Sequence, residues 1–169
     1  MHEAAHAVIY IVLGHTVRFV TLSNADGNGM TSTEPSEPDD EIVAIFAGGW
    51  AQRLFSDRPP KMWELRPDHE EINRILNIPA VFPAPALILQ REKLCVRALE
   101  LVIANERAIR AVADYLVKHK EIGDAEGRWS PNAGDIIKTI LDPAHACGYS
   151  LPGDVVIPLV NETPPSEMS

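Results

Sequence analysis

The hydrophobic pattern is clearest at residues 7–13, where every side chain is apolar. A helix that is apolar on all sides is normally buried, so this stretch predicts a core helix. The helix is expected to run from about His2 to Leu13 and to end at Gly14, a residue type suited to the position just after a helix. The apolar run is too short to cross a lipid bilayer.

Further along the chain, apolar positions recur at the period of 3.6 residues that is typical of helices. The predicted helices cover residues 40–55, 68–76, 86–119 and 130–141. The longest segment is one helix or two that meet near Asn105, and Asp39 or Asp40 is expected to cap the first. Gly48 and Gly49 lie inside that first helix, where each costs about 1 kcal/mol relative to alanine. Such glycines usually let another backbone approach closely, and the helix at the start of the chain is the expected neighbour.

A small β element is predicted between the first two helices. Residues 17–22 are rich in β-branched and aromatic side chains, which favours a strand. A turn signal at residues 26–29 precedes a second short strand at residues 30–33. The pattern predicts a mainly α, single-domain protein over residues 1–142, with a β-hairpin or small sheet beside the first helix. Residues 143–169 lose the periodicity and are expected to form an irregular tail.

The composition is that of an acidic globular protein with 169 residues, 46% hydrophobic residues and a formal net charge of −9. That charge disfavours nucleic acid and anionic membranes as partners. Cys95 and Cys147 form no C-x-x-C pair, which favours free thiols in a reducing, cytoplasmic compartment. The sequence has no recognisable membrane segment and no phosphate-binding loop, so no ATPase is expected in this chain.

The residues with the most specific chemistry are His2-Glu3-Ala4-Ala5-His6, which have the form H-E-x-x-H. Residues four apart lie on one face of a helix, so His2 and His6 can both point at one metal ion. Imidazole suits zinc, and Glu3 is placed to act as the general base toward a zinc-bound water. The alternative is a pair of core histidines whose polar atoms are satisfied by ordinary hydrogen bonds.

A catalytic zinc usually has a third protein ligand, and the local sequence leaves its identity open. Asp68 is one candidate. However, Asp68 followed by Glu71 also resembles a pair that caps a helix N-terminus, and the local pattern favours the cap. The other candidate ligands in this region are Glu64, His69, Glu70 and Glu71.

The order of these elements resembles the peptidase domain of the FtsH-type zinc metallopeptidases, the proteolytic part of the membrane AAA proteases. Residues 2–7 are similar to that family's HEAGHA motif, and residues 17–31 to its edge strand and turn. Residues 47–54 look like its glycine-pair helix. The segment that begins at Asp68 resembles the one carrying the family's aspartate ligand, and residues 104–122 resemble its C-terminal helices.

The resemblance implies a zinc metallopeptidase in which His2, His6 and Asp68 hold Zn²⁺ and Glu3 is the catalytic base. It implies hydrolysis of peptide bonds in extended or unfolded polypeptides, which would add a strand along the predicted strand at residues 17–22. The expected substrate-binding residues are Val17, Phe19, Val20, Thr21 and Gly29.

The sequence departs from the family's pattern in two respects. Ala5 stands where the family usually has glycine, and neither the family's ATPase nor its membrane anchor is expected in this chain. The peptidase is therefore expected to cut chains that are already extended, or to work with a separate ATPase or as a homo-oligomer. His15 and Tyr10 are candidates for a second donor to the oxyanion. The rival hypothesis is a catalytically inactive relative that binds peptides or regulates another protein.

Overall fold

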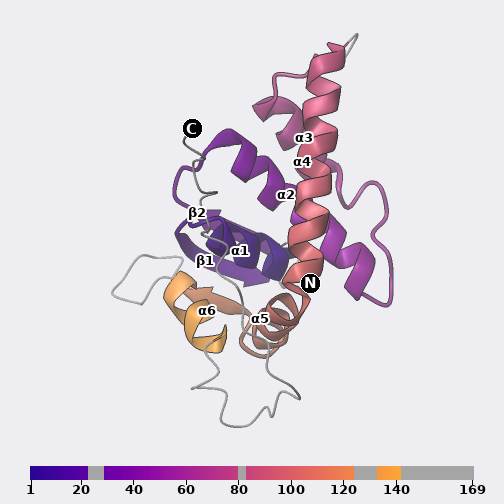
Figure 1. Ribbon diagram of the computed structural model, residues 1–169. Helices are drawn as coiled ribbons and strands as arrows, with labels where there is room; N and C mark the ends of the chain where they lie inside the picture. Colours follow the sequence, from indigo (N-terminus) through magenta and orange to yellow (C-terminus); the bar gives the residue numbers. More distant parts are fainter. Residues whose placement is uncertain (23–28, 80–82, 124–132, 142–169) are drawn as a thin grey trace, which may run out of the picture.

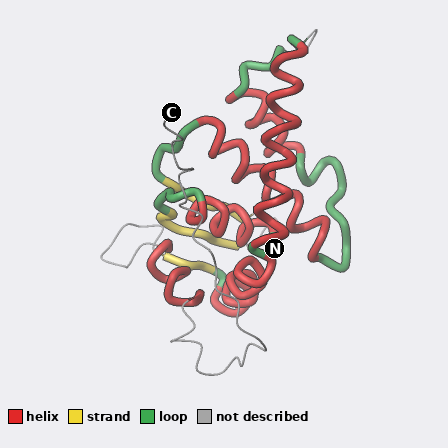
Figure 2. Tube along the Cα trace, viewed as in Figure 1, coloured by secondary structure: helices red, strands yellow, loops and turns green. Residues whose placement is uncertain are grey.

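The computed structural model describes residues 1–22, 29–79, 83–123 and 133–141. This part of the chain is mainly helical with one small antiparallel sheet, as predicted (Figure 1, Figure 2). In chain order the elements are α1 (His2–Val12), β1 (Val17–Leu22), β2 (Gly29–Thr33), α2 (Pro38–Phe55), α3 (Arg66–Ile75), α4 (Pro85–Ala104), α5 (Glu106–His119), β3 (Glu121–Gly123) and α6 (Ala133–Leu141). The predicted tail at residues 143–169 lies outside the described residues.

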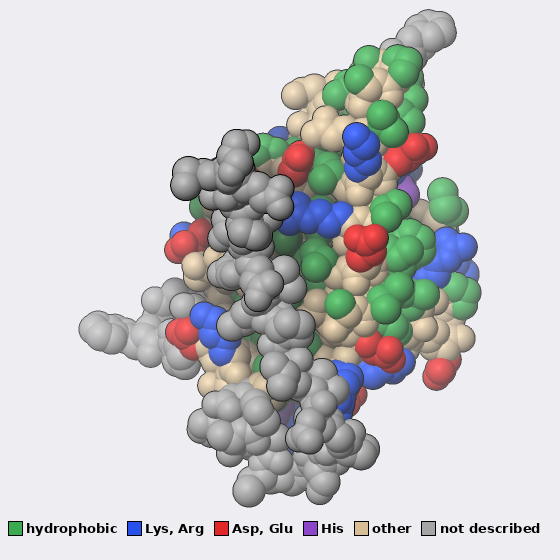
Figure 3. Space-filling view, in the orientation of Figure 1, with side chains coloured by type: hydrophobic (Ala, Val, Ile, Leu, Met, Phe, Trp, Pro, Cys, Tyr) green, Lys and Arg blue, Asp and Glu red, His purple; other side chains and the backbone are tan. Residues whose placement is uncertain are grey.

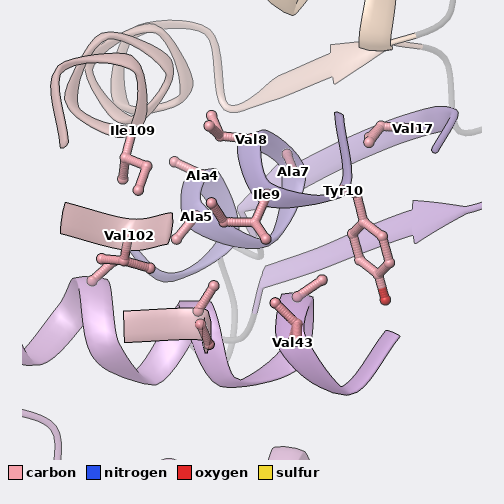
Figure 4. Close-up of a cluster of buried hydrophobic side chains, with 14 of the residues drawn as sticks. Ala4, Ala5, Ala7, Val8, Ile9, Tyr10, Val17, Val43, Val102 and Ile109 are labelled. Carbon is pink, nitrogen blue, oxygen red and sulfur yellow. The ribbon is translucent and has the colours of Figure 1, made fainter. Parts of the chain in front are cut away.

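Helix α1 lies at the centre of the fold, between the sheet and α2 (Figure 1). Val8 and Ile9 are fully buried, and they lie among Val17 of β1, Val43 of α2 and Ile109 of α5 (Figure 4). The alanines of α1 are equally buried, and their small side chains let the neighbouring helices approach closely. The expectation of a buried first helix is confirmed.

The sheet has the order β2-β1-β3, and both of its pairings are antiparallel. Val20 of β1 lies opposite Thr31 on one side and Ile122 on the other. The sequence did not predict β3, and the assignment of Glu121 and Ile122 to the C-terminal helices was wrong. The chain leaves α5 through Lys120, which has a left-handed backbone (φ 71°), and then pairs with β1. Such a three-residue strand depends on its partner and leaves little local signal.

The observed helix boundaries change the expected roles of the residues at the helix ends. Helix α2 begins at Pro38, so Asp39 and Asp40 lie inside its first turn and neither caps it. Two helices, α4 and α5, occupy the long periodic segment and meet at Asn105. The Asn105 side chain donates a hydrogen bond back to the Leu101 carbonyl, 2.8 Å away, and makes no cap bond to α5.

Helix α3 is the least buried of the helices described, and Ile72 is its one fully buried residue. Its backbone lies close to α2, and it faces α4 only through longer side chains such as Arg91 and His69. Among the described helices, none combines the length and the apolar character needed to cross a membrane.

Candidate metal centre

His2 and His6 lie one turn apart on α1, with perpendicular rings whose centroids are 4.5 Å apart. His6 is buried, and its Nδ1 donates a hydrogen bond to the Ala44 carbonyl oxygen at 2.7 Å. Nδ1 of His2 donates to Gln52 Oε1 at 3.2 Å. Because Nδ1 carries the proton in both rings, each Nε2 is left with the lone pair that a metal needs.

Three residues of α2, spaced four apart, lie against these two rings. Ala44 and Gln52 accept the two histidine hydrogen bonds, and Gly48 lies between them. A Cβ added at Gly48 would lie 2.5 Å from Nε2 of His6 and 2.9 Å from Cε1 of His2. The first helix is therefore the close neighbour of Gly48, as expected, but its histidine side chains make the approach, and the expected contact with its backbone is not found there. A Cβ at Gly49 would instead make ordinary contact with Leu65.

Asp68 brings a carboxylate from α3 to the same place. One ligand atom from each of His2, His6 and Asp68 lies within 4.8 Å of the others. Oδ2 of Asp68 is 3.1 Å from Nε2 of His2, yet it is fully enclosed and has no well-aligned hydrogen-bond donor among the residues that the structure describes. Two acceptor atoms that face each other at this distance need a positive charge between them, which a proton or a metal ion supplies.

The protonation of this group follows from its surroundings. Burial acts to lower the pKa of His2, but the Asp68 carboxylate outweighs it, so the pKa is raised above 6.5. Burial and the nearby His2 charge lower the pKa of His6. Burial acts to raise the pKa of Asp68, but the histidines beside it hold that pKa below 3.8. At neutral pH the site therefore contains an ionised carboxylate and a neutral His6.

The structure brings Asp68 to the histidines and leaves the rival third ligands elsewhere. Glu64 pairs with Arg58, Glu70 pairs with Arg66, and Glu71 pairs with Arg74. His69 accepts a hydrogen bond from Arg91. The locally favoured cap role of Asp68 is wrong, because Leu65 is the N-cap residue of α3 and no side chain caps this helix end.

Glu3 is held in place by β2. The Thr31 hydroxyl donates a hydrogen bond to Glu3 Oε2 at 3.0 Å. A Cβ at Gly29 would lie 2.7 Å from Cδ of Glu3, so the glycine makes room for the glutamate side chain. Thr31 and Gln52 were not predicted as site residues from the sequence. Only Gln52 carried a signal, because it lies four residues after Gly48 and so shares its face of α2.

An open pocket of about 210 Å³ connects these residues. It is lined by His2, Glu3, His6, Tyr10, Gly29, Met30, Thr31, Ile45 and Asp68. Of the two candidates for a second oxyanion donor, Tyr10 lies in this pocket, and burial raises its pKa to about 12. His15 is not among the lining residues and instead lies 3.1 Å from Asp40.

The prediction that a substrate adds to the edge of β1 is wrong, because β1 is the central strand. Val17 and Val20 are fully buried in the core, and Phe19 and Thr21 pair with β2 and β3. Gly29 alone of the five expected substrate-binding residues lines the pocket.

The sheet edge nearest to Glu3 is the outer edge of β2. Leu22 donates to the Lys120 carbonyl on the β3 side, so the backbone of the preceding residue, Thr21, faces β2 and pairs with Met30. By the same alternation, the backbone groups of Gly29, Thr31 and Thr33 face away from β1. Within the described chain no strand pairs with them.

No family model matches this chain, and no curated protein matches it. Any functional assignment therefore depends on the chemistry of the pocket, the H-E-x-x-H motif and the order of the elements.

Proposed function

We propose that this protein is a zinc-dependent metallopeptidase of the FtsH type. The observation that carries the proposal is the convergence of His2, His6 and Asp68 around an enclosed Asp68 Oδ2, which has no aligned donor within the described part of the chain. Two imidazoles and a carboxylate form a donor set that suits a catalytic zinc and leaves a fourth position open. The donors come from two segments separated by about sixty residues in sequence, which a satisfied pair of core histidines does not require.

The residues that hold the two histidine rings also suit a bound ion. Ala44 and Gln52 fix both histidine rings with Nε2 free, and the rings occupy the position that a Cβ at residue 48 would take, which only glycine allows. A zinc ion held there supplies a Lewis acid that polarises a carbonyl and lowers the pKa of water.

Glu3 is the general base in this proposal. Its carboxylate lies in the same pocket as the three ligands, and the Thr31 hydroxyl orients one of its oxygens. Glu3 takes a proton from the attacking water and delivers it to the leaving amine. Tyr10, like any tyrosine, is protonated at neutral pH, and burial raises its pKa further, to about 12, so it is the candidate hydrogen-bond donor to a developing oxyanion.

The substrate lies extended along the outer edge of β2. The backbone groups of Gly29, Thr31 and Thr33 on that edge are available to pair with an added strand. This edge replaces the edge of β1 in the original expectation, and it suits extended or unfolded polypeptides. The H-E-x-x-H helix, the glycine-pair helix and the aspartate-bearing α3 follow in the order of the FtsH-type family, which supports that assignment.

The test combines metal analysis with one substitution. Purified protein should bind about one zinc per chain, removable by a chelator. Glu3→Gln should keep the zinc and lower the rate of casein hydrolysis by about 10²–10⁴-fold. Glu70→Gln is the matched control, because Glu70 is an exposed residue of α3 paired with Arg66. Zinc-loaded, folded Glu3→Gln protein that cuts casein at the parent rate would refute the proposal, as would parent protein that holds zinc but cuts nothing.

The third ligand is tested separately by its effect on zinc affinity. Asp68→Ala should weaken zinc binding by at least about ten-fold, because the loss even of a residue that only supports a metal ligand typically has that effect. Glu64→Ala, Glu70→Ala and Glu71→Ala should leave it unchanged, because these carboxylates pair with arginines. A loss of affinity in one of the glutamate variants instead would assign the third position to that residue.

A further inference from the structure

A second cavity, of about 200 Å³, lies next to the candidate metal centre. It shares Asp68 and Ile45 with the metal-site pocket, so the two spaces are neighbours. Its walls come from α2, α3, α4 and the segment before α3, and they are mostly apolar, with Phe46, Trp50 and Ile72 among them. An apolar cavity of about 150 Å³ is large enough to hold benzene. This cavity therefore has room for a group the size of an aromatic side chain.

Arg91 of α4 lines this cavity and has no acidic partner within ion-pair distance among the described residues. Its guanidinium lies over the Phe46 ring, 5.3 Å from the centroid, and donates to His69 Nδ1 at 3.3 Å. Its Nε is fully enclosed, and none of the described residues forms a hydrogen bond with it. A guanidinium is always charged, and its fork of donors fits a carboxylate.

The charge of the cavity differs from that of the molecule as a whole. Arg53 and Arg91 both line it, and Asp68 is the only acid among its described lining residues. The whole chain has a net charge of −9, and on the face in Figure 3 acidic and basic side chains are interspersed. Since Asp68 is directed at His2, the cavity presents an excess of positive charge beside apolar walls.

We infer that this cavity binds a carboxylate carried on an apolar group, and that Arg91 recognises the carboxylate. In a peptide, such a group is either the C-terminal residue or an acidic side chain. That the carboxylate belongs to a peptide rests on the proposed peptidase function. Binding of the carboxylate itself needs neither zinc nor hydrolysis. Arg91 thereby makes the site selective for peptides with a carboxylate at a fixed place beside the cleaved bond.

The binding test uses the full chain with metal removed by a chelator, so that zinc cannot hold the carboxylate. 3-Phenylpropanoate and the uncharged 3-phenylpropanamide are titrated in turn, and the Trp50 indole signal is followed by NMR. The acid should bind at least about ten-fold more tightly than the amide, since a hydrogen-bonded charge pair is lost in the amide. Arg91→Met should abolish this preference, and Arg91→Lys, which keeps the charge without the fork, should retain part of it.

Arg74→Met is the matched control, because Arg74 pairs with Glu71 on the surface of α3 and does not line the cavity. This variant should bind both ligands like the parent. Equal affinities for acid and amide in the parent, or a preference that survives in Arg91→Met, would overturn the inference. If Arg91→Met does not fold, the inference is tested with the parent protein and Arg91→Lys. It is contradicted if 3-phenylpropanoate does not shift the Trp50 signal of the parent protein.

Three peptides then identify the source of the carboxylate. The first ends in phenylalanine with a free carboxylate, the second is its amide, and the third is amidated but contains an internal glutamate. If the cavity recognises the chain end, only binding of the first peptide should depend on Arg91. If it recognises an acidic side chain, binding of the third peptide should depend on Arg91. If no peptide depends on Arg91, the inference fails, even if zinc-dependent hydrolysis is found. If hydrolysis is absent but Arg91-dependent binding persists, the peptidase function fails and the cavity assignment stands.

Discussion

Helices α1 and α3 both contribute candidate metal ligands, but their surroundings differ greatly. α1 lies between the sheet and α2, and its residues from Ala4 to Tyr10 are all buried (Figure 4). α3 has one buried residue, Ile72, and its backbone lies near α2 alone. His6 is therefore fixed by the core of the protein, and His2 lies one turn before it on the same helix. Asp68, in contrast, stands on a helix with few contacts. A part of the chain with few buried contacts opens more readily than the core.

This difference gives a bound ion a structural role in addition to its chemistry. A metal held by His2, His6 and Asp68 would connect α3 to the core through Asp68. The free energy of binding then stabilises the position of α3, because the ligands are brought together only when α3 is docked.

The largest expected effect comes from matched truncations of two fully buried isoleucines, Ile9 in α1 and Ile72 in α3. Ile9→Ala should lower the free energy of unfolding by about 2–5 kcal/mol, because it leaves a cavity in the core. Ile72→Ala should lower it by less, since α3 can detach while the core stays folded, but it should weaken zinc binding at least about ten-fold. Urea unfolding of the metal-free proteins and zinc titration measure the two effects. Equal destabilisation by both variants would show that α3 unfolds with the core.

Metal removal gives the next largest effect. At a free zinc concentration about 100 times the dissociation constant, binding contributes about 2.7 kcal/mol to the folded state. The amides of α3 should therefore exchange with solvent up to about a hundred-fold faster after chelation, while the amides at the middle of α1 change much less. Native-state hydrogen exchange followed by NMR measures both helices in one sample. Uniform loss of protection across α1 and α3 would mean that the ion stabilises the whole fold without a special effect on α3.

The same contrast explains how much of the site was predictable from sequence. On α1 the helical period alone fixes which residues share a face, so the motif identified His2 and His6 together with Glu3. For Asp68 the local pattern favoured a cap, because it cannot show that α3 begins earlier, at Arg66, or that the carboxylate reaches a helix more than sixty residues away. Only the resemblance to a known family favoured Asp68 as the candidate third ligand.

Tertiary pairing was the other part that local patterns did not reveal. The residues 17–22 were recognised as a strand, but their place at the centre of the sheet depends on β3, which has three residues. The hydrogen bonds of Thr31 to Glu3 and of Gln52 to His2 likewise depend on how distant segments pack. Gly48 was the exception, because a glycine inside a helix indicates a close neighbour before the neighbour is known.

The two adjacent glycines of α2 allow the same comparison with single methyl groups, because Gly48 faces α1 and Gly49 faces Leu65, just before α3. Alanine favours a helix over glycine by about 1 kcal/mol at either position. Gly49→Ala should therefore leave stability unchanged or raise it by up to about that amount, because its Cβ meets only Leu65 at 3.4 Å. Gly48→Ala should weaken zinc binding by about ten-fold, since its Cβ would displace the His6 and His2 rings.

Thermal unfolding and zinc titration of the two glycine variants check this prediction. Gly48→Ala protein with parental zinc affinity would mean that the rings can shift without loss of the site. Gly49→Ala protein with weakened zinc binding would instead indicate that the whole helix, rather than one methyl group, had moved.

The smallest expected effect concerns the contact between α1 and α3 in the metal-free protein. The raised pKa of His2 stabilises the fold below pH 6.5, and this stabilisation is lost as pH rises through the folded-state pKa. The lowered pKa of Asp68 stabilises it above pH 3.8, and this is lost as pH falls through the lower folded value. The pair therefore stabilises the protein most in mildly acidic solution.

Asp68→Asn should lower the pKa of His2, because burial then acts on the imidazole without the carboxylate to oppose it. It should reduce the free energy of unfolding more at about pH 5.5 than at about pH 8.5, by about 1 kcal/mol or less, since both side chains are partly exposed. NMR titration of the His2 ring and urea unfolding at the two pH values measure these changes in chelated samples. An unchanged His2 pKa would mean that Asp68 does not face His2 when no metal is bound, so that α3 docks onto α1 only together with the ion.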